Sequence, residues 1–239
     1  MLARSFSTPA YTAIYSFETL QVSSPCEHVL QVELYRPSIR NAMNKVMLRE
    51  ILECFKRISE DKQWRTVVLT GSSADFSIGL DFNDMAGLLA SIINKPSADK
   101  TEDLARKAKY IRSLIVHSQD SFLSLEQCSK PVIAAIHGSC QGAAISLVAA
   151  ADIRFCSSDT LFQVKEVNLA ITPDMGTIQR LPKIGCNDSL VREMIYTGQK
   201  LTAAEAKEVK MLSHFVIIIK AYELIITCCF TDGLSWPHF

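Results

Sequence analysis

Two carboxylates, Glu166 and Asp174, lie near the two ends of the stretch VKEVNLAITPDMG (164–176), which is otherwise mostly apolar. A carboxylate can remove or deliver a proton, and two carboxylates held apart can act at two separate carbons of one substrate. Both residues also have an ordinary structural explanation, because a glutamate can end a strand and Pro-Asp is a common turn pair. The two side chains are therefore candidates for proton transfer, and the rest of the sequence must supply the groups around them.

A turn rich in small residues, HGSCQGAA (137–144), follows a predicted strand and precedes a predicted helix. Two interpretations stay open at this point. The G-x-C-x-G arrangement around Cys140 matches a nucleophile elbow, with Asp174 and His214 downstream in the order of a catalytic triad. Alternatively, the small residues let a ligand approach the backbone, and N–H groups at the helix start, together with one near Gly79, could bind a single carbonyl oxygen as an oxyanion hole.

The overall composition excludes several classes of partner. With 48% hydrophobic and 21% charged residues over 239 positions, the chain is typical of a globular protein with a sizeable core. Lys plus Arg balance Asp plus Glu at 25 each, so neither nucleic acid nor an anionic membrane is expected as a partner. The eight cysteines are interpreted as scattered reduced thiols, and the five histidines are dispersed, so no metal site is expected. The apolar runs near the C-terminus are shorter than the ~20 residues of a membrane-spanning helix, so no membrane span is expected.

Hydrophobic periodicity predicts an α/β fold. Strands are predicted at 28–37, 64–71, 130–138 and 160–167, and a turn at 172–176. Helices are predicted at 41–61, between about 86 and 125 with a solvated interruption at 94–103, and within 188–211 as two helices broken at Gly198. The stretch 139–156 is predicted as small residues followed by a helix. The first two strands and the helix between them form a strand–helix–strand unit.

Five ordered segments, LYRPSIRNAMN, DFSIGLDFNDM, KPVIAAIHGSCQGAAISLVAAADIRFC, FQVKEVNLAITPDMGTIQRLPKIG and YTGQKLTAAEA, resemble landmarks of the enoyl-CoA hydratase/isomerase (crotonase) superfamily. The resemblance runs from about residue 17 to residue 213, and the fourth segment is especially similar to the Δ3,5-Δ2,4-dienoyl-CoA isomerases. It implies a crotonase-like spiral of ββα units that binds an acyl-CoA thioester. It argues against the nucleophile-elbow interpretation of Cys140.

The resemblance also assigns roles by position. The oxyanion hole would be formed by the backbone N–H groups of Leu80 and Ala143, and the loop 77–81 would line the adenine pocket. Arg36 or Arg40 would contact the CoA phosphates. The remaining substrate-binding residues would be Ser77, Gly79, Asp81, Gly142 and Ser146.

The implied reaction converts a 3,5-dienoyl-CoA into a 2,4-dienoyl-CoA in fatty-acid β-oxidation. Asp174 is assigned to proton removal at C2 and Glu166 to proton delivery at C6, with the direction of the two roles left open. No cofactor is expected, because CoA is part of the substrate. The resemblance implies a mitochondrial or peroxisomal location, with the mitochondrion favoured, and a homo-trimer or hexamer for the family.

Two departures from the family pattern qualify these expectations. Dienoyl isomerases carry an aspartate, and hydratases a glutamate, where this chain has Ser146. The segment 213–239 resembles none of the C-terminal helices that build the family's trimer, so a truncated or replaced C-terminus is expected, which puts oligomerisation in doubt. We therefore expect a disordered or transit segment at 1–17, an acyl-CoA-binding core at 18–212 and an atypical apolar tail at 213–239. The alternative function is a non-catalytic acyl-CoA-binding or regulatory form.

Overall fold

The computed structural model describes residues 14–72, 74–84, 87 and 104–216. Its main sheet has the strand order β1-β2-β3-β4-β6-β9. β1 pairs antiparallel with β2, and every later pair is parallel. The strands are β1 (Leu20–Cys26), β2 (Val29–Leu34), β3 (Thr66–Gly71), β4 (Val132–Ile136), β6 (Ile153–Ser157) and β9 (His214–Val216).

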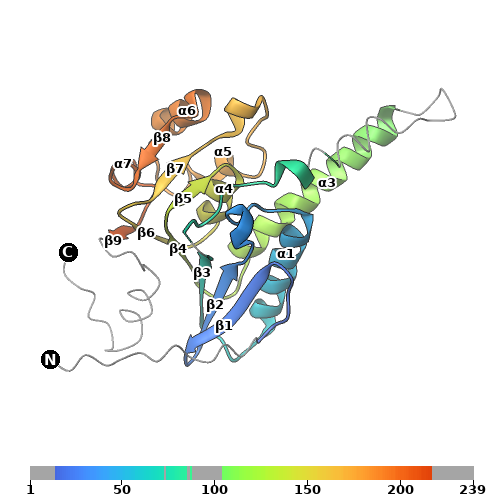
Figure 1. Cartoon of the computed structure of the whole chain (residues 1–239), viewed down its shortest axis with the longest axis vertical. Helices are drawn as coiled ribbons and strands as arrows, with labels where there is room; N and C mark the ends of the chain where they lie inside the picture. Colours follow the sequence, from blue (N-terminus) through green and yellow to red (C-terminus); the bar gives the residue numbers. More distant parts are fainter. Residues whose placement is uncertain (1–13, 73, 85–86, 88–103, 217–239) are drawn as a thin grey trace.

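A second, smaller sheet contains β5 (Ser139–Gln141), β7 (Leu161–Gln163) and β8 (Lys200–Thr202). β5 pairs parallel with β7, and β7 pairs antiparallel with β8. Along the chain, β4 and β6 in the main sheet are followed directly by β5 and β7 in the small sheet, and a helix comes after each pair. This alternation is the predicted spiral of ββα units, and Figure 1 shows the two sheets in separate layers.

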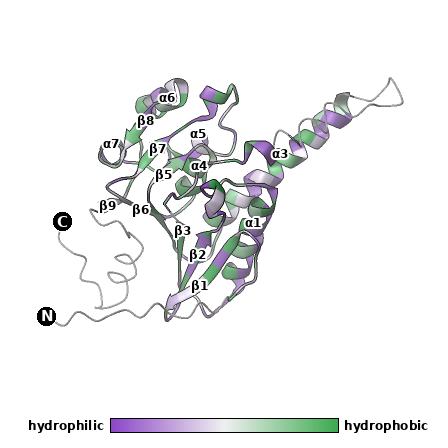
Figure 2. Cartoon of the chain, viewed as in Figure 1, coloured by the Kyte–Doolittle hydropathy of each residue, from purple (hydrophilic) through white to green (hydrophobic). Residues whose placement is uncertain are grey.

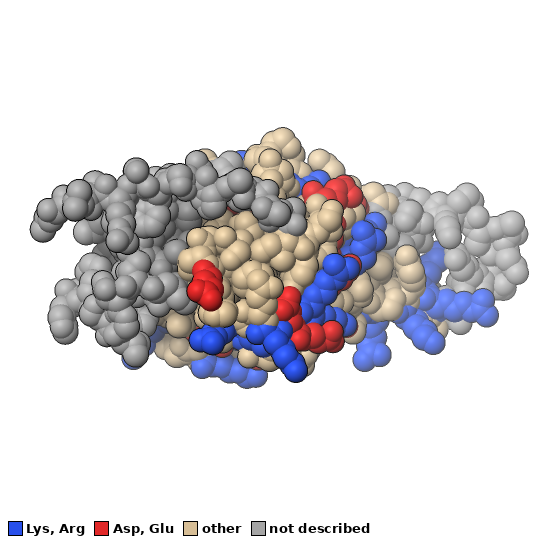
Figure 3. Space-filling model, turned by 90° about the horizontal axis from the view of Figure 1, so that it is seen from below, with Lys and Arg blue, Asp and Glu red and all other residues tan. Residues whose placement is uncertain are grey.

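Two long helices cover one face of the main sheet (Figure 1). In α1 (Lys45–Glu60) the Asn44 side chain caps the helix by accepting from the Met47 N–H, and buried residues such as Ile51 and Phe55 face the core. α3 (Leu104–Glu126) packs against α1 through its C-terminal third, where Phe122 and Leu125 are buried, and its other end projects from the body. Basic side chains gather on that side of the molecule in Figure 3, although the whole chain has no net charge.

The shorter helices lie around the small sheet and the strand ends. Figure 2 shows apolar residues concentrated along the strands and on the inner faces of the helices, as expected for a core between the layers. These helices are η1 (Pro37–Ile39), α4 (Ala143–Ala149), η2 (Glu166–Leu169), α5 (Thr177–Arg180), α6 (Asp188–Thr197) and α7 (Ala203–Glu208).

The predicted strand–helix–strand unit is confirmed by β2, α1 and β3, whose strands pair in parallel. The helix predicted within the stretch 139–156 is confirmed by α4, but the prediction that it continues to residue 156 is wrong. The stretch contains β5, the short helix α4 and then β6, because pairing of Ile153–Cys156 with β4 overrides the helical pattern. β1, β8 and β9 were not predicted, and β8 separates the two helices predicted within 188–211.

The packed part of the chain extends slightly beyond the predicted core at both ends. Ile14, Tyr15 and Phe17 pack against the hydrophobic core, and the Tyr15 hydroxyl donates to Asp61 Oδ2 at 2.9 Å. β9 lies within the predicted tail and pairs with β6. The remaining parts of the predicted terminal segments, 1–13 and 217–239, lie outside the described residues, as does the predicted interruption at 94–103. Within the part of the chain that the structure describes, no helix is both long and apolar enough to cross a membrane.

Candidate active site

The segment 77–81 is held by backbone hydrogen bonds on two sides. On one side the Ser77 N–H donates to Ser139 O and the Gln141 N–H donates to Ser77 O, each at 3.0 Å. On the other side the Met43 N–H donates to Gly79 O and the Asp81 N–H donates to Met43 O, each at 2.8 Å. The Leu80 N–H lies along the segment between the Gly79 carbonyl and the Asp81 N–H, which both bond Met43. The Leu80 N–H itself donates to no described residue.

Gly79 brings this segment into contact with the start of α4. A Cβ at Gly79 would lie 3.2 Å from the Ala143 nitrogen and 2.8 Å from the Gln141 oxygen, and its φ of +92° also favours glycine. The Ala143 N–H likewise donates to no described residue, whereas the Gly142 N–H is used by Gln163 O at 2.8 Å. Two unused backbone donors, from Leu80 and Ala143, are thus held on neighbouring segments.

Buried polar groups fix the chain that leads into this segment. The Asn41 side chain, fully buried, donates to the carbonyl oxygens of Ser72, Asp75 and Phe76, and the Ser77 hydroxyl donates to Asn41 O at 2.7 Å. Each of these groups would be left unsatisfied in the interior if the loop moved. The donor segment is therefore rigidly positioned before any ligand binds.

Two arginines at the site are occupied by carboxylates. Arg36 Nη1 donates to Asp81 Oδ2 at 3.0 Å and to Ala42 O at 2.6 Å. Arg40 binds both carboxylate oxygens of Asp75, and the hydrogen bond from Arg40 is the main cause that lowers the pKa of Asp75 to about 2. Both arginines brace the loops through these ion pairs.

Glu166, the first residue of η2, lies beside the donor segments. It is 7% exposed, and its Oε2 is buried without a hydrogen-bond partner among the described residues. A Cβ on Gly142 would lie 3.5 Å from Glu166 Oε1, so the carboxylate packs against the glycine that precedes Ala143. Burial raises the pKa of Glu166, nearby backbone N–H groups lower it, and the charge of Asp174 raises it further. A carboxylate with a raised pKa is suited to accept and return a proton.

Asp174 lies in the turn before α5 and is more exposed than Glu166. Its backbone is fixed by the Gln119 side chain, whose Nε2 donates to Asp174 O at 2.7 Å. Partial desolvation raises the pKa of Asp174, and its own backbone N–H lowers it. Its charge acts on Glu166, so the structure brings the two predicted carboxylates into the same region.

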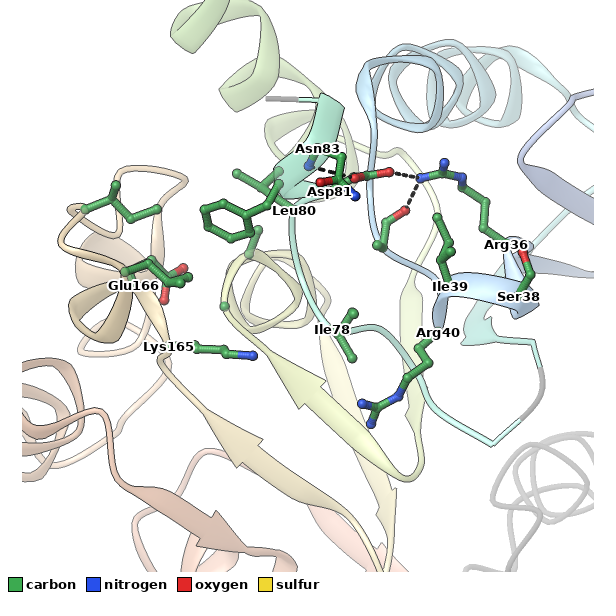
Figure 4. A pocket seen from close by; sticks show the side chains of 16 residues that line it. Arg36, Ser38, Ile39, Arg40, Ile78, Leu80, Asp81, Asn83, Lys165 and Glu166 are labelled. Atoms are coloured by element: carbon green, nitrogen blue, oxygen red, sulfur yellow. Dashed lines mark hydrogen bonds and ion pairs between the residues drawn. The ribbon is translucent and has the colours of Figure 1, made fainter. Parts of the chain in front are cut away.

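A pocket of about 560 Å³ opens beside Glu166. Figure 4 shows Glu166 and Lys165 on one side of it, Leu80 and Asp81 opposite, and Arg36 and Arg40 further along. Its lining includes seven of the residues predicted from the sequence for the site: Arg36, Arg40, Leu80, Asp81, Gly142, Ala143 and Glu166. Its wall also includes residues that were not predicted: Ser38, Ile39, Ala42, Ile78, Phe82, Asn83, Lys165, Leu169 and Ile171.

The other predicted residues are not among those that line this pocket. Ser77 and Gly79 shape the donor segment from behind. Ser146 is fully buried, and its hydroxyl hydrogen-bonds the buried Thr177 hydroxyl, so a neutral pair occupies this position in α4. Asp174 lies on its turn outside the lining.

The structure does not support Cys140 as a nucleophile. Cys140 is the central residue of β5 and is fully buried, whereas an elbow exposes its nucleophile at a sharp turn. Burial raises the pKa of the Cys140 thiol well above its ordinary value, so the reactive thiolate is disfavoured. In the part of the chain that the structure describes, no group of three or more His, Cys, Asp or Glu side chains could hold a metal ion.

The fold agrees with what comparison with known proteins finds. A family model described as enoyl-CoA hydratase/isomerase matches residues 26–218. The chain belongs to this family. A solved structure of an enoyl-CoA hydratase from Bacillus anthracis superimposes with a TM-score of 0.73 at 27% identity, covering 87% of this chain and 74% of that one. A Thermobifida fusca protein of this kind, solved in complex with acetoacetyl-CoA, gives a TM-score of 0.69 at 25% identity, covering 87% of this chain and 77% of that one.

Relatives with higher identity carry a more specific name. The mitochondrial Delta(3,5)-Delta(2,4)-dienoyl-CoA isomerase of Homo sapiens is 48% identical over 192 residues, covering 80% of this chain and 56% of that protein. The Mus musculus protein of that name is 45% identical, covering 86% of this chain and 61% of that protein. A peroxisomal Arabidopsis thaliana protein is 34% identical, covering 83% of this chain and 69% of that protein. The chain thus spans little more than half the length of the two mammalian relatives.

Proposed function

We propose that this chain is an isomerase of fatty-acid β-oxidation that converts 3,5-dienoyl-CoA into 2,4-dienoyl-CoA. The observation that carries the proposal is the buried carboxylate of Glu166, with one oxygen unpartnered, at a pocket also lined by the two residues with unused N–H groups, Leu80 and Ala143. The names of the mammalian relatives support the substrate class. Their names also favour a mitochondrial location over a peroxisomal one.

The proposed chemistry begins with the thioester carbonyl. The N–H groups of Leu80 and Ala143 bind the carbonyl oxygen and stabilise the negative charge that forms there, which acidifies the protons on C2. A carboxylate removes one C2 proton, and the electron pair of the C–H bond is delocalised over the oxygen and the two double bonds. Protonation at C6 then restores the thioester and leaves double bonds at C2 and C4. Asp174 removes the C2 proton and Glu166 protonates C6, or the two carboxylates have the opposite roles.

Ser146 restricts the alternatives. Hydration of an enoyl-CoA requires a water molecule activated between two carboxylates, and a serine hydroxyl cannot accept a proton at neutral pH. The Ser146 hydroxyl is also engaged by Thr177. Isomerisation requires no added water, so it is compatible with Glu166 and Asp174 alone.

The direct test is conversion of a 3,5-dienoyl-CoA, followed through the absorbance of the conjugated 2,4-dienethioester. Wild-type protein should turn over, and Glu166→Gln should lower kcat by about 10²- to 10⁴-fold, the usual contribution of a general acid or base. Glu193→Gln, at an exposed site on α6, is the matched control and should retain full activity. No turnover by folded wild-type protein would refute the proposal.

Ser146 also favours one competing function, which is binding of acyl-CoA without turnover. In that case wild-type protein and Glu166→Gln would bind the thioester with similar affinity, and neither would change its absorbance. Turnover that depends on Glu166 excludes this alternative.

A further inference from the structure

Three cationic side chains line the pocket, and one of them has no partner among the residues that the structure describes. Arg36 is bound to Asp81 and Ala42, and Arg40 is bound to Asp75 and to the Ser139 hydroxyl. The Lys165 side chain also lines the pocket, but it makes no hydrogen bond or ion pair with any other described residue. Its ammonium group is therefore available to a ligand.

The Lys165 side chain points into the pocket and not out into the solvent. Figure 4 shows it extending across the pocket toward Ile78, and Lys165 is only partly exposed. Glu166, the next residue in the chain, is buried in the same pocket wall. The two neighbouring side chains thus present opposite charges to one ligand at different depths.

We propose that Lys165 binds a phosphate group of the CoA moiety, an inference that rests on the proposed acyl-CoA substrate. A thioester carbonyl bound at Leu80 and Ala143 places its acyl chain beside Glu166, so the CoA portion must leave the pocket along the remaining wall. An ammonium group is a compact point charge that suits a phosphate, and it requires no fixed orientation of the ligand. Lys165 acts in binding and takes no part in proton transfer.

Two substrates with the same acyl chain test this assignment. One is the 3,5-dienoyl-CoA, and the other is the corresponding N-acetylcysteamine thioester, which carries no phosphate. In Lys165→Ala the KM for the CoA substrate should rise about 5- to 10-fold, as expected for one partly exposed charge pair, while kcat and the KM for the phosphate-free substrate stay unchanged. Lys183→Ala, at an exposed site outside the pocket lining, is the control and should alter neither KM.

The outcomes separate this inference from the proposed function. Equal KM changes for both substrates, or a lower kcat with both, would overturn it, because Lys165 would then act through the position of Glu166. If wild-type protein shows no turnover, the affinity of wild type and of Lys165→Ala for CoA itself can be measured by calorimetric titration. Weaker binding by Lys165→Ala would support the inference, and equal affinity would overturn it. Dephospho-CoA identifies the group involved: the effect of Lys165→Ala is lost with this ligand if the 3′-phosphate is bound and retained if the pyrophosphate is bound.

Discussion

The close approach of Gly79 to the start of α4 can be tested with a single methyl group. In Gly79→Ala the new Cβ would lie 2.8 Å from the Gln141 oxygen and 3.2 Å from the Ala143 nitrogen, and both are backbone atoms. An ordinary contact begins at 3.4 Å, so the two segments would have to separate by several tenths of an ångström. The φ of +92° adds strain for any L side chain, about 1–3 kcal/mol in such a region.

Gly185→Ala is the matched control, because its φ is +95° and its Cβ would meet nothing within 4 Å. Both variants should lose stability through φ strain, and Gly79→Ala should lose about 1–3 kcal/mol more from overpacking. Displacement of the Leu80 donor should also lower kcat of Gly79→Ala by about 10²-fold, while Gly185→Ala keeps the wild-type kcat. Urea unfolding and the dienoyl-CoA assay measure the two effects. A folded Gly79→Ala variant with a kcat within about threefold of wild type would refute the assigned role of this contact.

Two further predictions concern buried polar groups. Glu166→Gln should stabilise the fold at neutral pH, because burial raises the pKa of Glu166 and the folded state loses stability as the pH rises through that pKa. In thermal unfolding this advantage should vanish below about pH 4, and a Glu166→Gln variant less stable than wild type at pH 7 would contradict it. Ser146→Ala should lower the free energy of unfolding by about 1–3 kcal/mol, because it leaves the buried Thr177 hydroxyl without this partner. In a double-mutant cycle, adding Thr177→Val should recover part of that loss, and strictly additive losses would show that the two hydroxyls are not coupled.

The parts of the fold that could be predicted have local signals. α1 repeats apolar residues at helical spacing over sixteen residues, and β3 is a β-branched run that ends at Gly71. β8 and β9 have only three residues each, so they carry no readable period. β9 exists because β6 offers it a parallel partner far away in the sequence. Such pairing is a tertiary effect, which a local pattern cannot reveal.

Some residues of the candidate site likewise have a local signal in the sequence, and others do not. Gly79 and Gly142 marked the two donor segments because their backbone geometry requires glycine, and Glu166 could be placed by its motif. Lys165 was missed because a lysine beside a glutamate has the pattern of a solvated surface. Its significance depends on three-dimensional facts, since Arg36 and Arg40 are neutralised by residues from other segments. The partner of Ser146 was equally hidden, because Thr177 lies 31 residues later in the chain, after β6, β7 and η2.

The contrast between backbone and side-chain groups also indicates what limits the chemistry of this chain. Leu80 and Ala143 would contribute only N–H groups, and the Ala143 side chain is 3% exposed and packs in the hydrophobic core. The proposed reaction would therefore depend on the acids, and the position in α4 that could hold another acid contains Ser146, whose neutral hydroxyl pairs with Thr177 of α5. Because a water molecule could not be activated between Glu166 and a hydroxyl, a change from the proposed isomerisation to hydration would require a new buried carboxylate, while the loops could stay as they are.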